Sequence, residues 1–161
     1  MPALRSVLPA LAAALLLIAM VVAPALAQTL SERVVDESGV MSESQIAEAE
    51  SAITALEDED NVQLWALYVD TTDGEEVTDY ADAVAAENGL GGNDALLVVA
   101  IDDRRDALWI GDLLTEVSDQ ELDLILADRV EPQLRDSEWG AAVAGAAEGL
   151  SSALAGDVGP D

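Results

Sequence analysis

Carboxylates recur in this sequence wherever an apolar stretch ends. Ca²⁺ takes about six to eight oxygen ligands, commonly carboxylates and carbonyls. If the three apolar stretches concerned are parallel strands, their carboxyl ends share one edge of a sheet, where ligands bind in open α/β folds. The sequence therefore predicts a site there for Ca²⁺, or alternatively for Mg²⁺ or another divalent cation. The alternative is that these aspartates form turns and cap helices. The predicted metal ligands are Asp36, Asp70, Asp73, Asp102 and Asp103.

The composition excludes several other kinds of site. The 161-residue chain has no Cys, His or Lys, and its 33 acidic residues outnumber six arginines for a formal net charge of −27. It therefore cannot build a disulfide, a zinc–thiolate centre, a Ser-His-Asp triad or a P-loop. So negative a surface repels nucleic acid, which proteins bind by neutralising phosphates with cations. No direct binding to anionic lipid is expected either.

Residues 1–27 have the composition of a secretory signal. They contain a single arginine and no acidic residue, and the apolar run between Pro9 and Pro24 is shorter than the ~20 residues of a membrane span. Ala25-Leu26-Ala27 has the small-x-small form of a signal-peptidase site. We expect cleavage there, which leaves one secreted or extracytoplasmic domain over residues 28–161. An uncleaved membrane anchor is the alternative.

The rest of the chain alternates strand-like and helix-like segments. Ser42 and Ser118 are each followed three residues later by Gln or Glu, a capping box that opens a helix. Pro132 is expected to end or kink a helix. The order β-α-β-α-β-β-α-α predicts a three-layer α/β/α sandwich around a small mixed sheet, its last two strands forming an antiparallel hairpin. The predicted strands are 33–36, 62–69, 95–101 and 107–111.

Two stretches of the sequence together resemble a known family. Residues 34–42 read as a short strand, an Asp, a Gly and a Ser-capped helix. Residues 80–111 combine a Tyr-Ala helix, a Gly-rich loop, an Asn before an aliphatic strand, an Asp-Asp-Arg turn and a closing Ile-Gly. This set is similar to the TPM domain over about residues 33–155. The sequence departs from the family pattern at Asp94, which stands where a Gly is frequent, and after Gly111.

The resemblance implies an α/β/α sandwich with an acidic cation site, but not one activity. Members of the family include exported bacterial proteins, some of which bind calcium. Others are thylakoid-lumen proteins linked to photosystem repair and acid phosphatase activity, and receptor-accessory subunits. The resemblance also implies roles for polar motif residues beyond the metal ligands. Those expected to bind a phosphate group or a partner are Asn93, Asp94 and Arg104.

We therefore expect an exported TPM-like domain that binds a divalent cation and acts through envelope or membrane proteins. The alternative function is a metal-assisted acid phosphatase acting on phosphate esters. In it, Asp36 and Asp103 would hold the metal and Arg104 would bind the phosphate. The missing His and Lys remove the usual base and clamp, which favours binding over catalysis. A third interpretation is a purely structural acidic domain.

Overall fold

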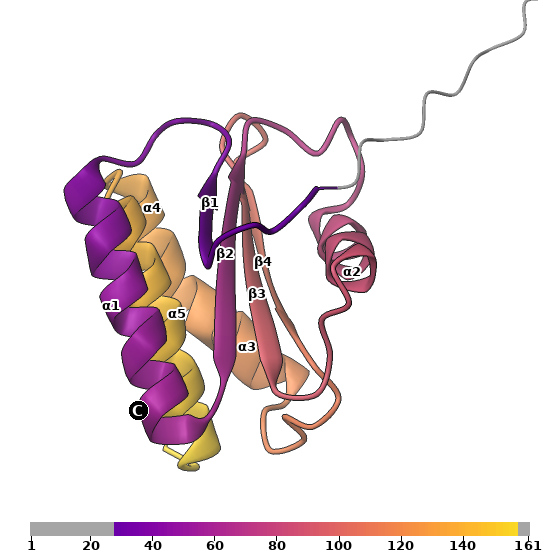
Figure 1. Ribbon diagram of the computed structural model, residues 1–161, viewed down its shortest axis with the longest axis vertical. Coiled ribbons are helices and arrows are strands. Elements are labelled where there is room, and N and C mark those ends of the chain that lie inside the picture. Colours follow the sequence, from indigo (N-terminus) through magenta and orange to yellow (C-terminus); the bar gives the residue numbers. More distant parts are fainter. Residues whose placement is uncertain (1–27, 158–161) are drawn as a thin grey trace, which may run out of the picture.

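The computed structural model describes residues 28–157, so the predicted signal peptide and its cleavage site lie outside the described residues. The element order confirms the predicted β-α-β-α-β-β-α-α, because α3, η1 and α4 follow one another as a single helical stretch (Figure 1). The elements are β1 (Val34–Asp36), α1 (Glu43–Asp60), β2 (Gln63–Val69), α2 (Val77–Glu87), β3 (Asp94–Ala100), β4 (Arg105–Ile110), α3 (Asp119–Ile125), the π-helical η1 (Leu126–Val130), α4 (Glu131–Arg135) and α5 (Trp139–Leu154).

The four strands form one mixed sheet in the order β1-β2-β3-β4. The first three strands are parallel, and β4 runs antiparallel to β3, as predicted. Tyr68 on β2 pairs with Asp36 on one side and with Val99 on the other. The strand β4 begins two residues earlier than predicted, because its ladder with β3 continues to the pair of Ala100 and Arg105.

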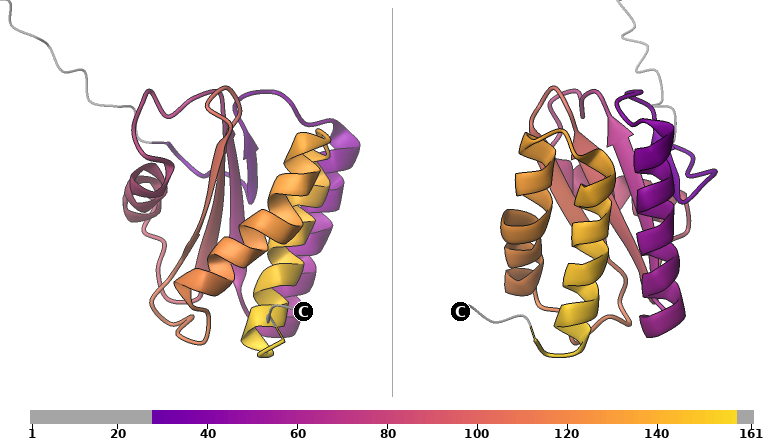
Figure 2. Two further views of the ribbon diagram at one scale, coloured as in Figure 1. Left: turned by 180° about the vertical axis from the view of Figure 1, so that it is seen from behind. Right: turned by 90° about the vertical axis from the view of Figure 1, so that its left-hand side faces the viewer.

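Helices cover both faces of the sheet. The helix α2 packs on one face, against Leu96 and Val98 of β3. The helices α1 and α5 lie on the other face, over a core that includes Leu97 and Val99 (Figures 1 and 2). Because alternate side chains of β3 meet different helices, the strand needs apolar residues at nearly every position. This explains its uninterrupted apolar sequence.

Local signals fix the ends of the main helices. Ser42 caps α1 and Ser118 caps α3, and both predicted capping boxes are present. Pro132 does not end its helix, because it lies in the first turn of α4, directly after the π-helical segment η1. Such a π-helical segment is a rare irregularity that occurs mostly as a single turn inside an α-helix. Within residues 28–157, none of the helices has the length and apolar character needed to cross a membrane.

Candidate functional site

The loops that carry the predicted aspartates lie at one edge of the sheet. The strands β1, β2 and β3 are parallel, so the loops after their carboxyl ends meet there, as predicted (Figure 1). The amide of Asp102 donates to the carbonyl oxygen of Asp70 at 2.8 Å, which joins the loops after β2 and β3. The edge predicted from the sequence is therefore formed.

The carboxylate of Asp36 organises the loop that follows β1. Its Oδ2 accepts a hydrogen bond from the Met41 amide at 2.8 Å. Its Oδ1 accepts from the Ser38 hydroxyl at 3.1 Å and from the Val40 amide at 3.3 Å. Three donors within five residues make Asp36 a turn-forming residue, the alternative noted for the aspartates.

The carboxylate of Asp103 joins the β3–β4 turn to the loop after β2. Its Oδ2 accepts from the Thr72 amide at 2.8 Å and from the Thr71 hydroxyl at 3.0 Å. The hydrogen bond from the Thr72 backbone, followed by the one from the Thr71 hydroxyl, lowers the pKa of the Asp103 carboxyl below its usual value. Asp103 is thus held ionised as a link between two loops.

The five predicted ligands share an edge without forming one cluster. Among residues 28–157, no group of three or more carboxylates is placed to hold a metal ion. The carboxylate of Asp36 accepts hydrogen bonds within its own loop, whereas that of Asp103 accepts them from the loop after β2. The carboxylates of Asp70, Asp73 and Asp102 accept no hydrogen bond from the described residues.

A cleft of about 410 Å³ opens beside the loop after β2, on the face of the sheet covered by α2. We call it the acidic cleft. It contains Tyr80 and no arginine. Burial, and then the negative charges of Glu37 and Glu75, raise the pKa of the Tyr80 hydroxyl. The carboxylates that line the cleft belong to Glu37, Asp70, Asp73, Glu75 and Glu87.

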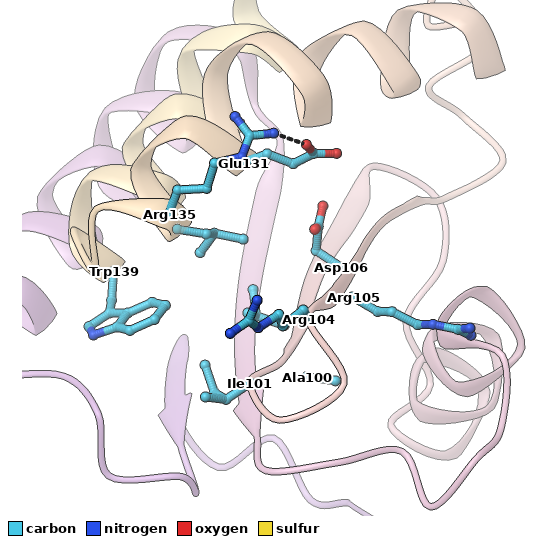
Figure 3. Close-up of a pocket in the computed structure, with 10 residues that line it drawn as sticks. Ala100, Ile101, Arg104, Arg105, Asp106, Glu131, Arg135 and Trp139 are labelled. Carbon is cyan, nitrogen blue, oxygen red and sulfur yellow. Dashed lines mark hydrogen bonds and ion pairs between the residues drawn. The ribbon is translucent and has the colours of Figure 1, made fainter.

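A second pocket, of about 600 Å³, lies on the opposite face of the sheet, between the β3–β4 turn and the helices α4 and α5 (Figure 3). We call it the arginine pocket, because Arg104, Arg105 and Arg135 are among its lining residues. Burial, assisted by the negative charge of Glu131, raises the pKa of Asp106 to about 6, while Arg135 opposes the shift. Asp106 therefore titrates near neutral pH.

The three arginines of this pocket differ in their partners. Arg105 is turned toward α2 and forms an ion pair with Glu76 at 3.0 Å (Figure 3). Arg135 pairs with Glu131 at 2.6 Å, one turn earlier on α4. The guanidinium of Arg104 has no hydrogen-bond or ion-pair partner within residues 28–157. Its backbone has a φ of 53°, a left-handed conformation that costs a non-glycine residue about 1 kcal/mol or more.

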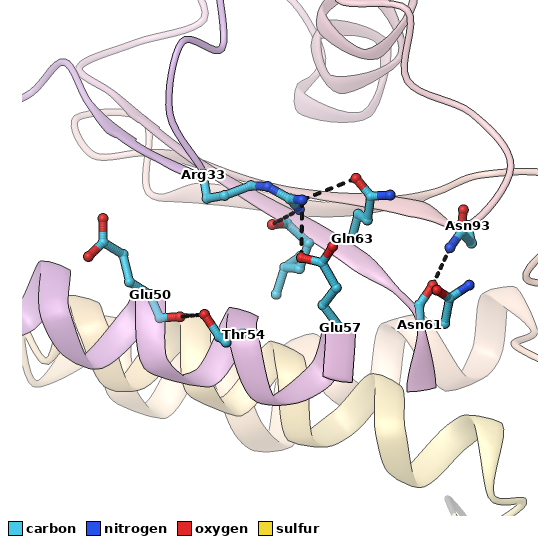
Figure 4. Close-up of polar contacts among 8 residues, drawn as sticks. Arg33, Glu50, Thr54, Glu57, Asn61, Gln63 and Asn93 are labelled. Carbon is cyan, nitrogen blue, oxygen red and sulfur yellow. Dashed lines mark hydrogen bonds and ion pairs between the residues drawn. The ribbon is translucent and has the colours of Figure 1, made fainter. Parts of the chain in front are cut away.

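Asn93 and Asp94 lie at the other end of the sheet from Arg104. The Asn93 side-chain amide donates to the carbonyl oxygen of Asn61 (Figure 4). Asp94 Oδ2 accepts from the Gly91 amide at 3.0 Å. The strand β3 separates Asp94 from the Arg104 turn by about 20 Å, at roughly 3.3 Å per residue. The three residues predicted to bind phosphate or a partner therefore do not form one site, because they flank opposite ends of the same strand.

The TPM domain family matches residues 34–153 of this sequence. The chain belongs to the TPM domain family. Two curated relatives of this TPM domain are UPF0603 proteins of Mycobacterium tuberculosis, MT2410 and Rv2345, each 33% identical to it over 122 residues. The match covers 76% of this chain and only 18% of each relative, so this TPM domain spans less than a fifth of their length.

Solved structures share the fold of this TPM domain. The N-terminal domain of cg2496 from Corynebacterium glutamicum has a TM-score of 0.66 at 21% identity, covering 81% of this chain and 85% of that one. An N-terminal domain from P. gingivalis has a TM-score of 0.66 at 23% identity, covering 76% of this chain and 82% of that one. BA42 from Bizionia argentinensis has a TM-score of 0.60 at 20% identity, covering 75% of this chain and 85% of that one. The resemblance seen in the sequence and the α/β fold are thus both confirmed.

Sequence reasoning missed the residues that complete both cavities. Glu75 was hidden among many acidic residues, and no spacing rule singles it out. Asp106 falls just before the predicted strand 107–111, whereas in the structure it lies within β4, opposite Val99. Its partners Glu131 and Arg135 come from a helix more than twenty residues later in the sequence. A charged residue at an inward-facing position of a strand can indicate a functional site. The position of Asp106 can be recognised as inward-facing only when the first residue of β4 is known.

Proposed function

We propose that this TPM domain is an extracytoplasmic module that binds a divalent cation in the acidic cleft. The observation that carries the proposal is a cleft lined by five carboxylates and no arginine. Two of the predicted ligands, Asp70 and Asp73, lie there with carboxylates that accept no hydrogen bond from residues 28–157. A bound cation would relieve the mutual repulsion of these carboxylates.

Ca²⁺ suits this cleft better than Mg²⁺. Mg²⁺ requires nearly ideal octahedral geometry, whereas Ca²⁺ accepts irregular sets of carboxylates, carbonyls and waters. No three carboxylates of the described chain are already gathered around a point. The ion would therefore be held by Asp70 and Asp73 with backbone carbonyls and water. Such a loosely assembled site fits the weak affinities of extracellular modules, with a Kd of about 10⁻⁴ to 10⁻³ M.

The bound ion would also bear on partner choice. The formal net charge of −27 repels other acidic surfaces, and neutralising one cleft locally reduces that repulsion. We propose that the domain contacts envelope or membrane proteins through this face when the cation is bound. TPM domains are often extracytoplasmic, where millimolar Ca²⁺ would occupy a site of this affinity.

The acid phosphatase is the less supported alternative. Arg104, its expected phosphate ligand, lines a pocket on the face of the sheet opposite the acidic cleft. A cation held by Asp70 and Asp73 would therefore lie in a different cavity from a phosphate group bound at Arg104, whereas metal assistance needs both in one site.

Thermal unfolding tests the cation site. At about 10 mM Ca²⁺, a Kd between 10⁻⁴ and 10⁻³ M adds about 1.4 to 2.7 kcal/mol of stability by mass action. The melting temperature should rise more in CaCl₂ than in NaCl of equal ionic strength. The double variant Asp70→Asn/Asp73→Asn should lose this difference. Its control is Asp123→Asn/Asp128→Asn, two exposed residues outside the cleft, which makes the same change in charge. Equal shifts in the two salts would refute the proposal.

A further inference from the structure

The walls of the arginine pocket combine apolar and charged groups. Ile101, Leu134 and Trp139 form an apolar wall, and the turn after β3 places Arg104 at its edge (Figure 3). Half of the ten lining residues are apolar and half are charged, so the lining is more polar than that of a typical ligand pocket. The pocket faces α4 and α5, so it is separate from the acidic cleft, which faces α2.

Arg104 is held in a conformation that its side chain does not favour. The residue has a φ of 53°, where glycine or asparagine is less strained. No contact within residues 28–157 accounts for the guanidinium, which has no ion-pair or hydrogen-bond partner there. The hairpin itself accounts for this conformation, because Arg104 closes the turn between β3 and β4 and its amide donates to the Ile101 carbonyl oxygen at 3.3 Å. What bears on ligand binding is the guanidinium, which is exposed and leaves its donors available at the edge of the pocket.

The charges of the pocket indicate a ligand with a single negative charge. Arg135 is neutralised by Glu131, and Arg105 by Glu76. One guanidinium, that of Arg104, is left to attract an anion. A planar carboxylate matches its fork with two parallel hydrogen bonds. A doubly charged phosphate would keep an unmatched charge near Glu131.

We propose that the arginine pocket binds a carboxylate attached to an apolar group. Arg104 binds the carboxylate, and Ile101, Leu134 and Trp139 contact the apolar part. Two sources share this chemistry: a free short-chain fatty acid, and the C-terminus of a peptide that ends in an apolar residue. The proposal is independent of the cation site, because the two cavities share no lining residue.

Asp106 should make this binding depend on pH. After burial, the groups that act on the pKa of Asp106 are Glu131 and Arg135 from α4, and Arg104 lines the same pocket. Together with burial, the charge of Asp106 in turn helps to raise the pKa of Tyr68 on β2. With a pKa of about 6, the Asp106 carboxyl is protonated at pH 5 and can donate a hydrogen bond to the ligand. At pH 7.5 it is ionised and repels the ligand. Affinity should therefore fall several-fold between these values.

Calorimetric titration of the purified protein tests the proposal. The probes are hexanoate, N-acetyl-Ala-Leu with a free C-terminus, its C-terminal amide and inorganic phosphate. We expect at least one carboxylate probe to bind at least tenfold tighter than the amide and phosphate. Tighter binding of hexanoate indicates a fatty acid, and tighter binding of the dipeptide indicates a peptide C-terminus. Phosphate binding as tight as either carboxylate would overturn the proposal, as would no carboxylate binding at about 20 mM.

Variants of two arginines separate ligand binding from folding. Arg104→Gln should weaken carboxylate binding at least tenfold, whereas Arg129→Gln, which removes a charge outside the pocket, should change it less than twofold. Arg104→Gly also relieves the left-handed conformation. It should lose binding while keeping or raising the melting temperature. Unchanged binding in both Arg104 variants would refute the assignment.

Discussion

The Tyr68 hydroxyl, on β2, donates a hydrogen bond of 2.7 Å to the backbone carbonyl oxygen of Trp139, the first residue of α5. The two rings also meet edge to face, with centroids 6.2 Å apart at 77°. Burial raises the pKa of Tyr68 further above its already high value, so the hydroxyl keeps its proton at any physiological pH. A polar contact between neutral groups thus fixes the start of α5 on the sheet.

Tyr68→Phe removes this hydrogen bond and leaves the ring in place. It should lower the free energy of unfolding by about 1 to 2 kcal/mol, because the Trp139 carbonyl loses its buried donor. Urea denaturation measures the change. Tyr80→Phe is the control, since no described residue hydrogen-bonds to the Tyr80 hydroxyl, and should change the value by less than about 0.5 kcal/mol. A similar loss in both variants would contradict the role given to the bond.

Asp103→Ala should destabilise the protein at pH 7 but not near pH 2. The lowered pKa of Asp103 means that the folded state favours its ionised form. This stabilisation is present above the ordinary pKa of about 4 and is lost as pH falls through the lowered value. Thermal melts at both pH values measure the difference in melting temperature between the wild type and the variant. Asp102→Ala is the neighbouring control, because no described donor contacts that carboxylate. A difference in melting temperature that persists near pH 2 would contradict the link between the stability of the protein and the ionisation of Asp103.

Asp106→Asn should show the opposite pH dependence. Because the folded protein raises the pKa to about 6, its stabilising contribution is greatest below about pH 4 and is lost as pH rises through 6. Asparagine resembles the protonated acid and does not ionise. The variant should match the wild type at pH 4 and exceed its stability by about 1 kcal/mol at pH 7.5, after allowance for partial exposure. Urea denaturation at both values decides, and a wild type that is the more stable at pH 7.5 would refute the prediction.

Gly140→Ala should separate α5 from α1. A Cβ at this buried position would collide with the backbone oxygen of Gln45 and lie 2.8 Å from Glu48 Oε2. Backbone cannot yield as a flexible side chain can, so we expect a loss of about 1 to 3 kcal/mol. Gly91→Ala is the control, since nothing lies within 4 Å of its Cβ position. Denaturation midpoints compare the two, and equal effects would contradict the packing argument.

Much of the fold follows from local sequence. The capping serines at Ser42 and Ser118 bond within their own first turns, so spacing alone reveals them. The apolar run of β3 predicts a strand covered on both faces. In contrast, the spacing of Gly145 and Gly149, four residues apart, does not predict which segment packs against this side of α5. The structure places their Cβ positions against Arg129 and Ile125, which a larger residue would displace.

The candidate sites were less predictable, for a physical reason. The sheet edge could be foreseen because parallel strands deliver their loops to one side. The direction of each carboxylate could not be foreseen, because it depends on donors such as the Thr72 amide in a different loop. The family resemblance groups Asn93 with Arg104 only because both residues belong to the same sequence motif. An extended strand between them carries the two to opposite ends of the sheet.

The outermost strands bear on how copies of this chain meet. The strand β1 has three residues, and β4 begins with Arg105 and Asp106. Short or charged margins of a sheet are poor templates for a strand donated by another molecule. A chain that is 51% hydrophobic therefore carries built-in protection against fibrillar stacking, independent of the repulsion between whole molecules.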